Sequence, residues 1–193
     1  VVLAALAPAL SGGMRGYAAD SDFEITDGVL TNYKGSGGAV KIPSGKVTAI
    51  DDEAFYNCVG ITSLTVPEGV KTVGKKAFYN CSSMTDISLP ASVKSIGELS
   101  FEGCSKLQNI NVAENSGYYA SEGGVLLNSE KTQLLRYPQG KTAASYTVPS
   151  GVTVIGRNAF AHCLSLVKIM LPTGLKQISD NAFYGGSGIA SSP

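Results

Sequence analysis

The feature that most constrains the fold is a phrase of residues that recurs at a fixed spacing. Five phenylalanines, each preceded by alanine or serine, lie 23, 23, 59 and 23 residues apart, and four prolines repeat the 23, 59, 23 spacing. A cysteine follows four of the phenylalanines by three residues. Three kinds of residue therefore share one period, which indicates repeated structural units. Because one such unit cannot bury its apolar face alone, the repeats predict a solenoid of stacked coils. The markers are Phe55, Phe78, Phe101, Phe160 and Phe183, with Pro67, Pro90, Pro149 and Pro172.

The coil that begins at Cys81 carries the internal pattern most clearly. Ile87 and Leu89 alternate with polar residues and predict a short strand with one face inward. Pro90 then removes a backbone donor and ends the strand, and the Ala-Phe segment of each coil is expected to form a short helical or 3-10 turn. The sequence therefore predicts an α/β repeat solenoid with a parallel β-sheet on one face and helical turns on the other.

One coil is longer than the rest. The interval between the third and fourth phenylalanines equals one coil of 23 residues plus a variant of 36 residues, which we place at about residues 113–148. Within it, Val125–Leu127 and Leu134–Tyr137 flank the turn-like segment Asn128–Lys131. This arrangement predicts a β-hairpin that extends one coil or projects from its edge.

The two ends of the chain differ from the repeats. We expect residues 1–19 to be the remnant of a secretory signal peptide, because the first ten residues are apolar and small residues follow them. This apolar run is far shorter than the roughly 20 residues of a membrane-spanning helix. Residues 20–38 predict an N-terminal cap with a hairpin around Thr26–Gly28, and residues 39–185 form the repeat domain. Residues 186–193 are either a C-terminal tail or a truncation.

The repeating unit resembles the repeat of a known family. Written as Cys-x-x-Leu-x-x-Ile-x-Val-Pro-x-x-Val-x-x-Ile-Gly-x-x-Ala-Phe, it resembles the BspA-type leucine-rich repeat over roughly residues 39 to 185. Leu99-Ser100 and Ala113 depart from the pattern without threatening the fold. This family is found in bacterial surface antigens and in some protist surface proteins, so the resemblance implies a secreted or wall-associated protein. Some members adhere to host matrix proteins or to other bacteria, and the resemblance does not imply an enzyme.

The charge balance argues against some classes of partner. Lysine plus arginine and aspartate plus glutamate each number 15, and no run of like charges occurs. A nucleic-acid binder or a polybasic membrane-surface protein would carry an excess of positive charge. We therefore expect no nucleic-acid partner and no membrane insertion after leader removal.

The cysteines occupy one position of the repeat. Cys58, Cys81 and Cys104 are expected to stack in adjacent coils, while Cys163 is separated from them by the 36-residue coil. Side chains in equivalent positions of parallel coils are poorly aimed at each other for a disulfide, although a spacing of about 4.8 Å does not exclude one. We expect small buried thiols rather than disulfides.

No catalytic or metal site stands out. The chain has one histidine, His162, which is expected to be a surface loop residue, and it has no Cys-x-x-Cys pair. A catalytic triad would have to include His162, and no nucleophile elbow accompanies it. The carboxylates Asp51 to Glu53 are typical of a solvated turn, and Gly35 to Gly38 lacks the ending of a phosphate loop. We therefore expect no enzyme and no cofactor.

Two surfaces are candidates for ligand binding. The first is the outward face of the predicted sheet, whose polar side chains could bind a ligand or could simply be solvated. The second is the hairpin patch of the variant coil, whose residue types are enriched at interaction hot spots, although its tyrosines could instead pack the insertion onto the solenoid. The sheet face comprises Ser63, Thr65, Asp86, Ser88, Asn109, Asn111, Ser145, Thr147, Lys168 and Met170, preceded by Ala39 and Lys41. The hairpin patch comprises Tyr118, Tyr119, Arg136 and Tyr137.

These features lead to a main functional hypothesis and two others. The main one is an extracellular module that binds a protein or glycan of another cell or of the extracellular matrix. The second is a structural spacer or scaffold that displays another domain and has no specific ligand. A hydrolase with an unrecognised site is the third and has no catalytic residues to support it.

Overall fold

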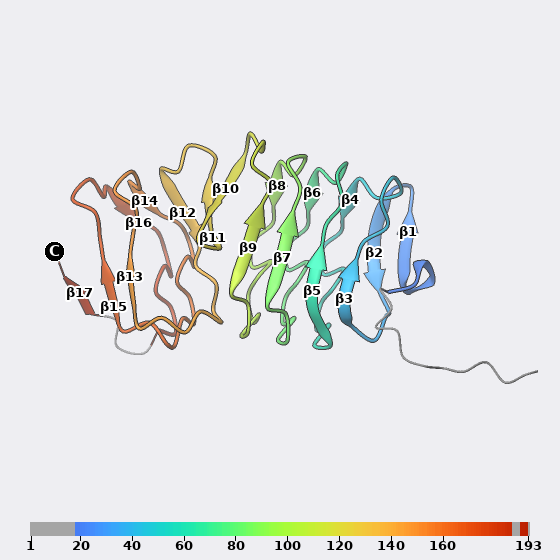
Figure 1. The fold of residues 1–193 in the computed structure, drawn as a ribbon, viewed down its shortest axis with the longest axis horizontal. Coiled ribbons are helices and arrows are strands. Elements are labelled where there is room, and N and C mark those ends of the chain that lie inside the picture. Colours follow the sequence, from blue (N-terminus) through green and yellow to red (C-terminus); the bar gives the residue numbers. More distant parts are fainter. Residues whose placement is uncertain (1–17, 187–189, 193) are drawn as a thin grey trace, which may run out of the picture.

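Each coil of the chain contributes two strands in the computed structural model, which describes residues 18–186 and the backbone of 190–192. The longer strands stand side by side in one row, and shorter strands form a second row behind them (Figure 1). Apolar side chains fill the space between the two rows. The chain is therefore a solenoid of stacked coils with parallel strands, as the 23-residue period predicts.

The row of longer strands consists of two sheets. Neighbouring strands pair in parallel register with an offset of one repeat, so that Leu64 lies beside Ile87 and Ile87 beside Ile110. These inward residues are buried, while their neighbours along the strand face outward. The first sheet contains β3 (Gly38–Lys41), β5 (Ile61–Thr65), β7 (Asp86–Leu89) and β9 (Asn109–Val112), and the second contains β13 (Ser145–Thr147), β15 (Lys168–Met170) and β17 (Ala190–Ser192).

The second row corrects the sequence-based prediction. This side carries two-residue strands, and the Ala-Phe segments that were expected to be helical or 3-10 form turns instead. The 3-10 turn η1 (Asp20–Asp22) is the one helical segment among residues 18–186 and 190–192. The predicted α/β class is therefore wrong, and the fold is a β-solenoid. The short strands are β4 (Ala49–Ile50), β6 (Thr72–Val73), β8 (Ser95–Ile96), β14 (Val154–Ile155) and β16 (Gln177–Ile178).

The Ala-Phe segments form turns because their backbone donors are used between coils. The N–H of Phe55 donates to the carbonyl of Ala77 at 2.8 Å, and the N–H of Asn57 donates to that of Tyr79 at 2.9 Å. A donor used in this way is not available for the i to i−4 bond of an α-helix. Glu53 and Asn57 also have φ of 58° and 59°, in the left-handed region that interrupts a right-handed helix.

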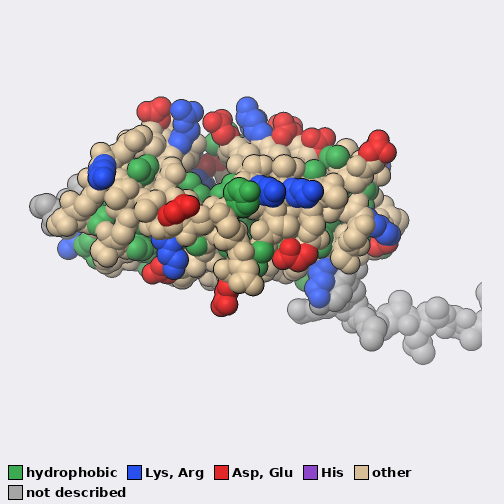
Figure 2. Space-filling model, turned by 90° about the horizontal axis from the view of Figure 1, so that it is seen from above, with side chains coloured by type: hydrophobic (Ala, Val, Ile, Leu, Met, Phe, Trp, Pro, Cys, Tyr) green, Lys and Arg blue, Asp and Glu red, His purple; other side chains and the backbone are tan. Residues whose placement is uncertain are grey.

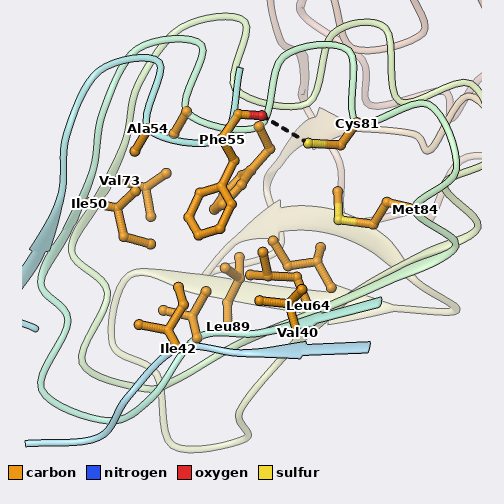
Figure 3. Packing of buried hydrophobic residues seen from close by; sticks show 14 of the residues in the cluster. Val40, Ile42, Ile50, Ala54, Phe55, Leu64, Val73, Cys81, Met84 and Leu89 are labelled. Carbon is orange, nitrogen blue, oxygen red and sulfur yellow. Dashed lines mark hydrogen bonds between the residues drawn. The ribbon is translucent and has the colours of Figure 1, made fainter. Parts of the chain in front are cut away.

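The phenylalanines of successive coils stack in the centre of the core. Ring centroids lie 5.2 to 5.8 Å apart along the series Phe23, Tyr33, Phe55, Phe78 and Phe101. Figure 3 shows side chains from both rows of strands converging on the ring of Phe55. Aromatic stacking of this kind contributes about 0.5–1.5 kcal/mol per pair beyond the area that is buried, so the period of the sequence is also the period of the core.

The variant coil forms an antiparallel insertion within the solenoid. β10 (Tyr119–Glu122), β11 (Val125–Asn128) and β12 (Gln133–Arg136) pair antiparallel, and β12 then pairs in parallel with β14. The expected hairpin is present, with a third strand added, and it lies in the sheet of short strands β14 and β16 rather than projecting from it (Figure 1). The core is divided at this point into two clusters, which define a first and a second stack of coils.

The N-terminal side of the solenoid begins with a second hairpin. β1 (Phe23–Thr26) and β2 (Val29–Tyr33) pair antiparallel around Asp27 and Gly28, both of which have positive φ. The hairpin expected at this turn is therefore confirmed. Most of the predicted leader, residues 1–17, lies outside the described residues. Within the described part of the chain, no helix is long and apolar enough to cross a bilayer.

Candidate functional site

The sheet β3–β5–β7–β9 places its outward side chains in two rows. Thr65, Ser88 and Asn111 form part of one row and are exposed, and they share this row with Lys41. Asp86 and Asn109 lie in the other row and are half-buried, and Asn109 Nδ2 donates to Asp86 Oδ1 at 2.8 Å. The structure therefore brings the predicted residues of these four strands onto one face, with Ser63 and Ala39 completing the second row.

The remaining predicted residues of the sheet face lie on a separate sheet. Ser145 pairs with Lys168 and Thr147 with Met170, on β13 and β15. They do not continue the first face, because the variant coil covers the edge of β9 through the bond from Ile110 N–H to the carbonyl of Gly124, at 2.9 Å. A cavity of about 300 Å³ lies at this junction and is lined by Asn109, Gly123, Val125, Tyr137, Lys141 and Tyr146.

The predicted hairpin patch does not form one surface. Tyr118 is 48% exposed, and the ammonium group of Lys94 lies 5.8 Å from its ring centroid. Tyr119 is half-buried, and its hydroxyl accepts a hydrogen bond from Ile96 N–H at 3.0 Å. Arg136 and Tyr137 are buried. The alternative in which the tyrosines pack the insertion onto the solenoid therefore holds for Tyr119 and Tyr137, and Arg136 is buried beside them, which was not predicted.

The repeat explains the burial of Arg136 and Tyr137. Tyr137 lies 23 residues before Phe160 and occupies the phenylalanine position of the variant coil, where its ring stacks on Phe160 at 5.3 Å. Arg136 consequently occupies the position that is alanine in four other coils and buried in each of them. A charged side chain in a position for a buried methyl group requires a partner.

A cleft separates the two stacks beside this arginine. Its cavity has a volume of about 400 Å³ and lies between β8 with the turn that follows it on one side and β12 with the turn that follows β14 on the other. Figure 2 shows the surface hollowed between the stacks, with acidic and basic side chains in the hollow. Its polar lining comes from Glu98, Ser100, Glu102, Gln133, Arg136, Arg157 and Asn158. Its apolar walls include Ile96, Leu99, Phe101, Tyr119, Leu126 and Leu135.

Arg136 joins the two stacks at the bottom of the cleft. Its Nη1 lies 3.2 Å from Oε2 of Glu102 and donates to the carbonyl of Asn158 at 2.7 Å. Its Nη2 donates to the carbonyl of Phe101 at 3.4 Å. The side chains of Arg136 and Glu102 are 8% and 13% exposed. The guanidinium thus bonds carbonyls of both stacks and is neutralised by a buried carboxylate.

Gln139 and His162 surround the same carboxylate. Gln139 Nε2 donates to Oε1 of Glu102 at 3.0 Å, and His162 Nε2 lies 3.5 Å from that oxygen. His162 is exposed, as predicted from its loop position. Two buried atoms of the cluster, Nε of Arg136 and Oε2 of Glu102, have no hydrogen-bond partner in the protein.

Sequence reasoning missed Glu102 and Gln139 as members of a cluster. The signal that could have found the site is the repeat position of Arg136, one residue before the aromatic position. Ser100 carries a second polar substitution of the same alanine position in the preceding coil, and its hydroxyl contacts the carbonyls of Gly97 and Gly74 at 2.6 and 3.0 Å. Two successive coils thus carry a polar residue, Ser100 and then Arg136, in place of the alanine before the aromatic residue. These two replacements mark where the regular stacking of coils is interrupted.

The cysteines are free thiols, as predicted from their positions. Each buried thiol donates to the carbonyl of the aromatic residue in the preceding coil. Burial raises the pKa of Cys104 and of Cys163 to about 12 and also raises the pKa of Cys81. These thiols are protonated and inert near neutral pH, which suits a structural role. The contacts are Cys81 to Phe55 at 3.2 Å, Cys104 to Phe78 at 3.1 Å and Cys163 to Tyr137 at 3.6 Å.

Comparisons with known proteins identify a family and a fold. Residues 26–128 and 138–191 match the BspA type leucine-rich repeat region in six copies. A search of curated proteins finds no match.

Among residues 18–186 and 190–192, no group of three or more histidine, cysteine, aspartate or glutamate side chains could hold a metal ion.

Solved structures of bacterial repeat proteins share the fold. The pneumococcal vaccine antigen PcpA is 23% identical, with a TM-score of 0.67 over 86% of this chain and 48% of that one. A leucine-rich repeat protein from Eubacterium ventriosum is 26% identical, with a TM-score of 0.60 over 84% of this chain and 60% of that one. One from Bacteroides ovatus is 26% identical, with a TM-score of 0.52 over 81% and 45%. The chain thus spans about half the length of these proteins.

Proposed function

Because the chain belongs to the BspA-type leucine-rich repeat family, we propose that it is an extracellular module that binds a protein or glycan through the sheet β3–β5–β7–β9. The observation that carries this proposal is the exposed row of Lys41, Thr65, Ser88 and Asn111, which the strand register holds at one spacing. Rigid sheets hold binding groups at fixed positions more accurately than loops do. Hydroxyl and amide groups in such a row can donate to and accept from a ligand.

The size of the face defines what a partner must contact. Four strands at a spacing of about 4.8 Å, each about four residues long, present roughly 200 Å². A standard protein interface covers about 800 Å² on each partner. A protein ligand would therefore also cover the turns that flank the strands, whereas a glycan could bind to the row alone.

A scaffold that displays another domain is the alternative function. It is favoured by the composition of the exposed row, which contains no tryptophan, tyrosine or arginine. These three residue types dominate the binding energy at protein interfaces. A secreted or cell-surface location belongs to both proposals, and its support is the apolar stretch that begins the sequence.

Substitution on the two sides of the solenoid tests the binding proposal. The triple variant Thr65→Ala, Ser88→Ala, Asn111→Ala alters the exposed row, and Thr72→Ala, Ser95→Ala is the matched control on the exposed short strands. Both variants and the wild type are screened against immobilised fibronectin, fibrinogen and laminin and against a glycan array. We expect the triple variant to bind at least about ten-fold more weakly and the control to be unchanged.

Two results would contradict this proposal. Binding that the triple variant retains in full would place the ligand on another surface. A folded wild-type chain that binds neither the matrix proteins nor any glycan would favour the scaffold function.

A further inference from the structure

The row of longer strands is interrupted between β9 and β13, where each strand is the edge of its sheet. The variant coil lies between them, so the two strands do not pair (Figure 1). It covers the edge of β9, because Ile110 N–H donates to the carbonyl of Gly124 at 2.9 Å. Val112 N–H likewise donates to the hydroxyl of Ser121 at 3.0 Å. In the described part of the chain, no such bonds cover the facing edge of β13.

The strand β13 uses only alternate residues to pair with β15. The carbonyl of Ala144 accepts from β15, and the N–H of Val148 donates to it. By the alternation of a parallel ladder, Tyr146 also serves β15, whereas Ser145 and Thr147 direct their N–H and carbonyl groups toward the junction. The hydrogen bonds within residues 18–186 include no acceptor for these two N–H groups. β13 therefore presents a short strand edge with unused donors and acceptors.

We propose that the free edge of β13 binds an extended segment of a partner protein, which pairs as an added strand and places an acidic side chain beside Lys141. A strand edge is a template for pairing with another chain. In strand addition, main-chain bonds provide affinity and a side-chain pocket provides specificity. Ser145 and Thr147 are exposed, so a segment can approach this edge from solvent. The inference concerns a different surface from the sheet β3–β5–β7–β9 and does not depend on binding there.

The cavity of about 300 Å³ beside β13 provides the side-chain pocket. Side chains of an added strand alternate between its two faces, so one of them can enter this cavity while its neighbours remain outside. Several lining residues on both sides of the junction are exposed or half-buried and therefore accessible to a ligand. They are Gln108 and Glu122 on one side, and Lys141, Thr142 and Tyr146 on the other.

The charges of the cavity select an acidic side chain. The carboxylate of Glu122 lies 3.5 Å from Lys131 and is already paired. The ammonium group of Lys141 lies 5.9 Å from the ring centroid of Tyr137, and no described carboxylate forms an ion pair with it. Burial lowers the pKa of Lys141, because its charge is partly removed from water. A carboxylate of the added strand would give this charge a partner, whereas a lysine of that strand would be repelled.

Peptides that differ only in their central charge provide the test. The probe is acetyl-Thr-Val-Thr-Glu-Thr-Val-Thr-amide, and its analogues carry glutamine or lysine in place of the glutamate. The ¹⁵N-labelled full chain is titrated with each peptide to millimolar concentration. We expect the glutamate peptide to shift the amides of Ser145 and Thr147 and to slow their hydrogen exchange, which a contact with side chains alone would not do. We expect the lysine analogue to bind at least about ten-fold more weakly.

Two substitutions locate the binding at this edge. Thr147→Pro removes an N–H that the fold does not use, and proline is tolerated on an edge strand in such a position. We expect it to bind the glutamate peptide at least about ten-fold more weakly than Thr147→Ala, which loses the side chain but keeps the N–H. Lys141→Glu decides the matter if Thr147→Pro does not fold, because it should reverse the preference in favour of the lysine analogue. The control is the short-strand variant Thr72→Ala, Ser95→Ala, which should bind as the wild type does.

Three results would overturn the added strand. The first is that no peptide of the set shifts the amides of Ser145 and Thr147 at millimolar concentration. The second is equal binding of the glutamate and lysine peptides to the wild type. The third is binding that a folded Thr147→Pro variant retains in full, or a peptide preference that Lys141→Glu leaves unchanged.

Discussion

The Sγ atom of Cys104 lies 3.1 Å from the carbonyl oxygen of Phe78, which belongs to the aromatic turn of the preceding coil. This oxygen also accepts from the N–H of Cys81 at 3.2 Å, so it is not orphaned when the thiol is removed. Replacing Cys104 with alanine therefore removes one bond between coils and leaves a small void. We expect Cys104→Ala to lower the free energy of unfolding by about 1–2 kcal/mol, measured by urea denaturation.

Cys58 provides the matched control for this substitution. Its side chain is half-buried, and its Sγ lies 3.9 Å from the carbonyl oxygen of Tyr33, too far for a strong bond. We expect Cys58→Ala to cost less than about 0.5 kcal/mol. Equal losses for the two variants would show that the short contact at Cys104 does not contribute to stability.

The same thiols predict how stability changes at alkaline pH. Burial raises the pKa of Cys104 and Cys163 to about 12, whereas a cysteine in an unfolded chain ionises near about pH 8.5. Their contribution to stability is fully present below about pH 8.5 and is lost as the pH rises toward 12, because the unfolded chain releases protons that the folded chain retains. The free energy of unfolding should fall by up to about 1.4 kcal/mol per pH unit for each such thiol.

Urea denaturation between about pH 8 and about pH 10 measures this slope. The double variant Cys104→Ala, Cys163→Ala is the control, and its stability should fall less steeply over the same interval. If both proteins lost stability equally, other groups would account for the alkaline instability.

The ion pair between the stacks predicts an unequal response to arginine substitutions. Arg136→Met would leave the carboxylate of Glu102, which is 13% exposed, without its cation. Breaking a buried pair from one side costs about 3–5 kcal/mol. Arg157 is 57% exposed and pairs with Glu98 and Asp180, so Arg157→Met should change the free energy of unfolding by less than about 1 kcal/mol. Similar effects of the two substitutions in urea denaturation would contradict the buried pairing.

The sequence predicts the repeating parts of this fold well. The period determines which residues point inward, because each coil must bury the same positions against its neighbours. It accordingly predicted the rows on β3, β5, β7 and β9 and the free thiols, whereas Ser145, Thr147, Lys168 and Met170 lie on a separate sheet. The turns around Phe55 were predicted as helical because the choice between a helix and inter-coil bonding depends on the adjacent coil, whose Ala77 carbonyl accepts the Phe55 N–H.

The candidate site was harder to predict because it lies where the repeat is interrupted. Residue type alone placed Arg136 among the candidate interaction residues of the hairpin patch, since arginine is seldom buried without a partner. Its partner Glu102 is 34 residues away in the sequence, in the coil that precedes the insertion. Only the repeat position indicates burial, and only the three-dimensional arrangement shows that Arg136 and Glu102 meet beside a cavity.

The aromatic position of the variant coil leads to the last prediction. Tyr137 is 1% exposed, and its ring packs against Phe160 at 5.3 Å and against Tyr146 at 4.8 Å. Replacing a buried aromatic ring with alanine costs about 3–5 kcal/mol, so Tyr137→Ala should strongly destabilise the second stack. Tyr137→Phe keeps the ring and should cost less than about 1.5 kcal/mol. Tyr184 is 61% exposed, so Tyr184→Ala is the surface control. If urea denaturation gave Tyr137→Ala and Tyr184→Ala the same small loss in free energy of unfolding, Tyr137 would not occupy the aromatic position of the core.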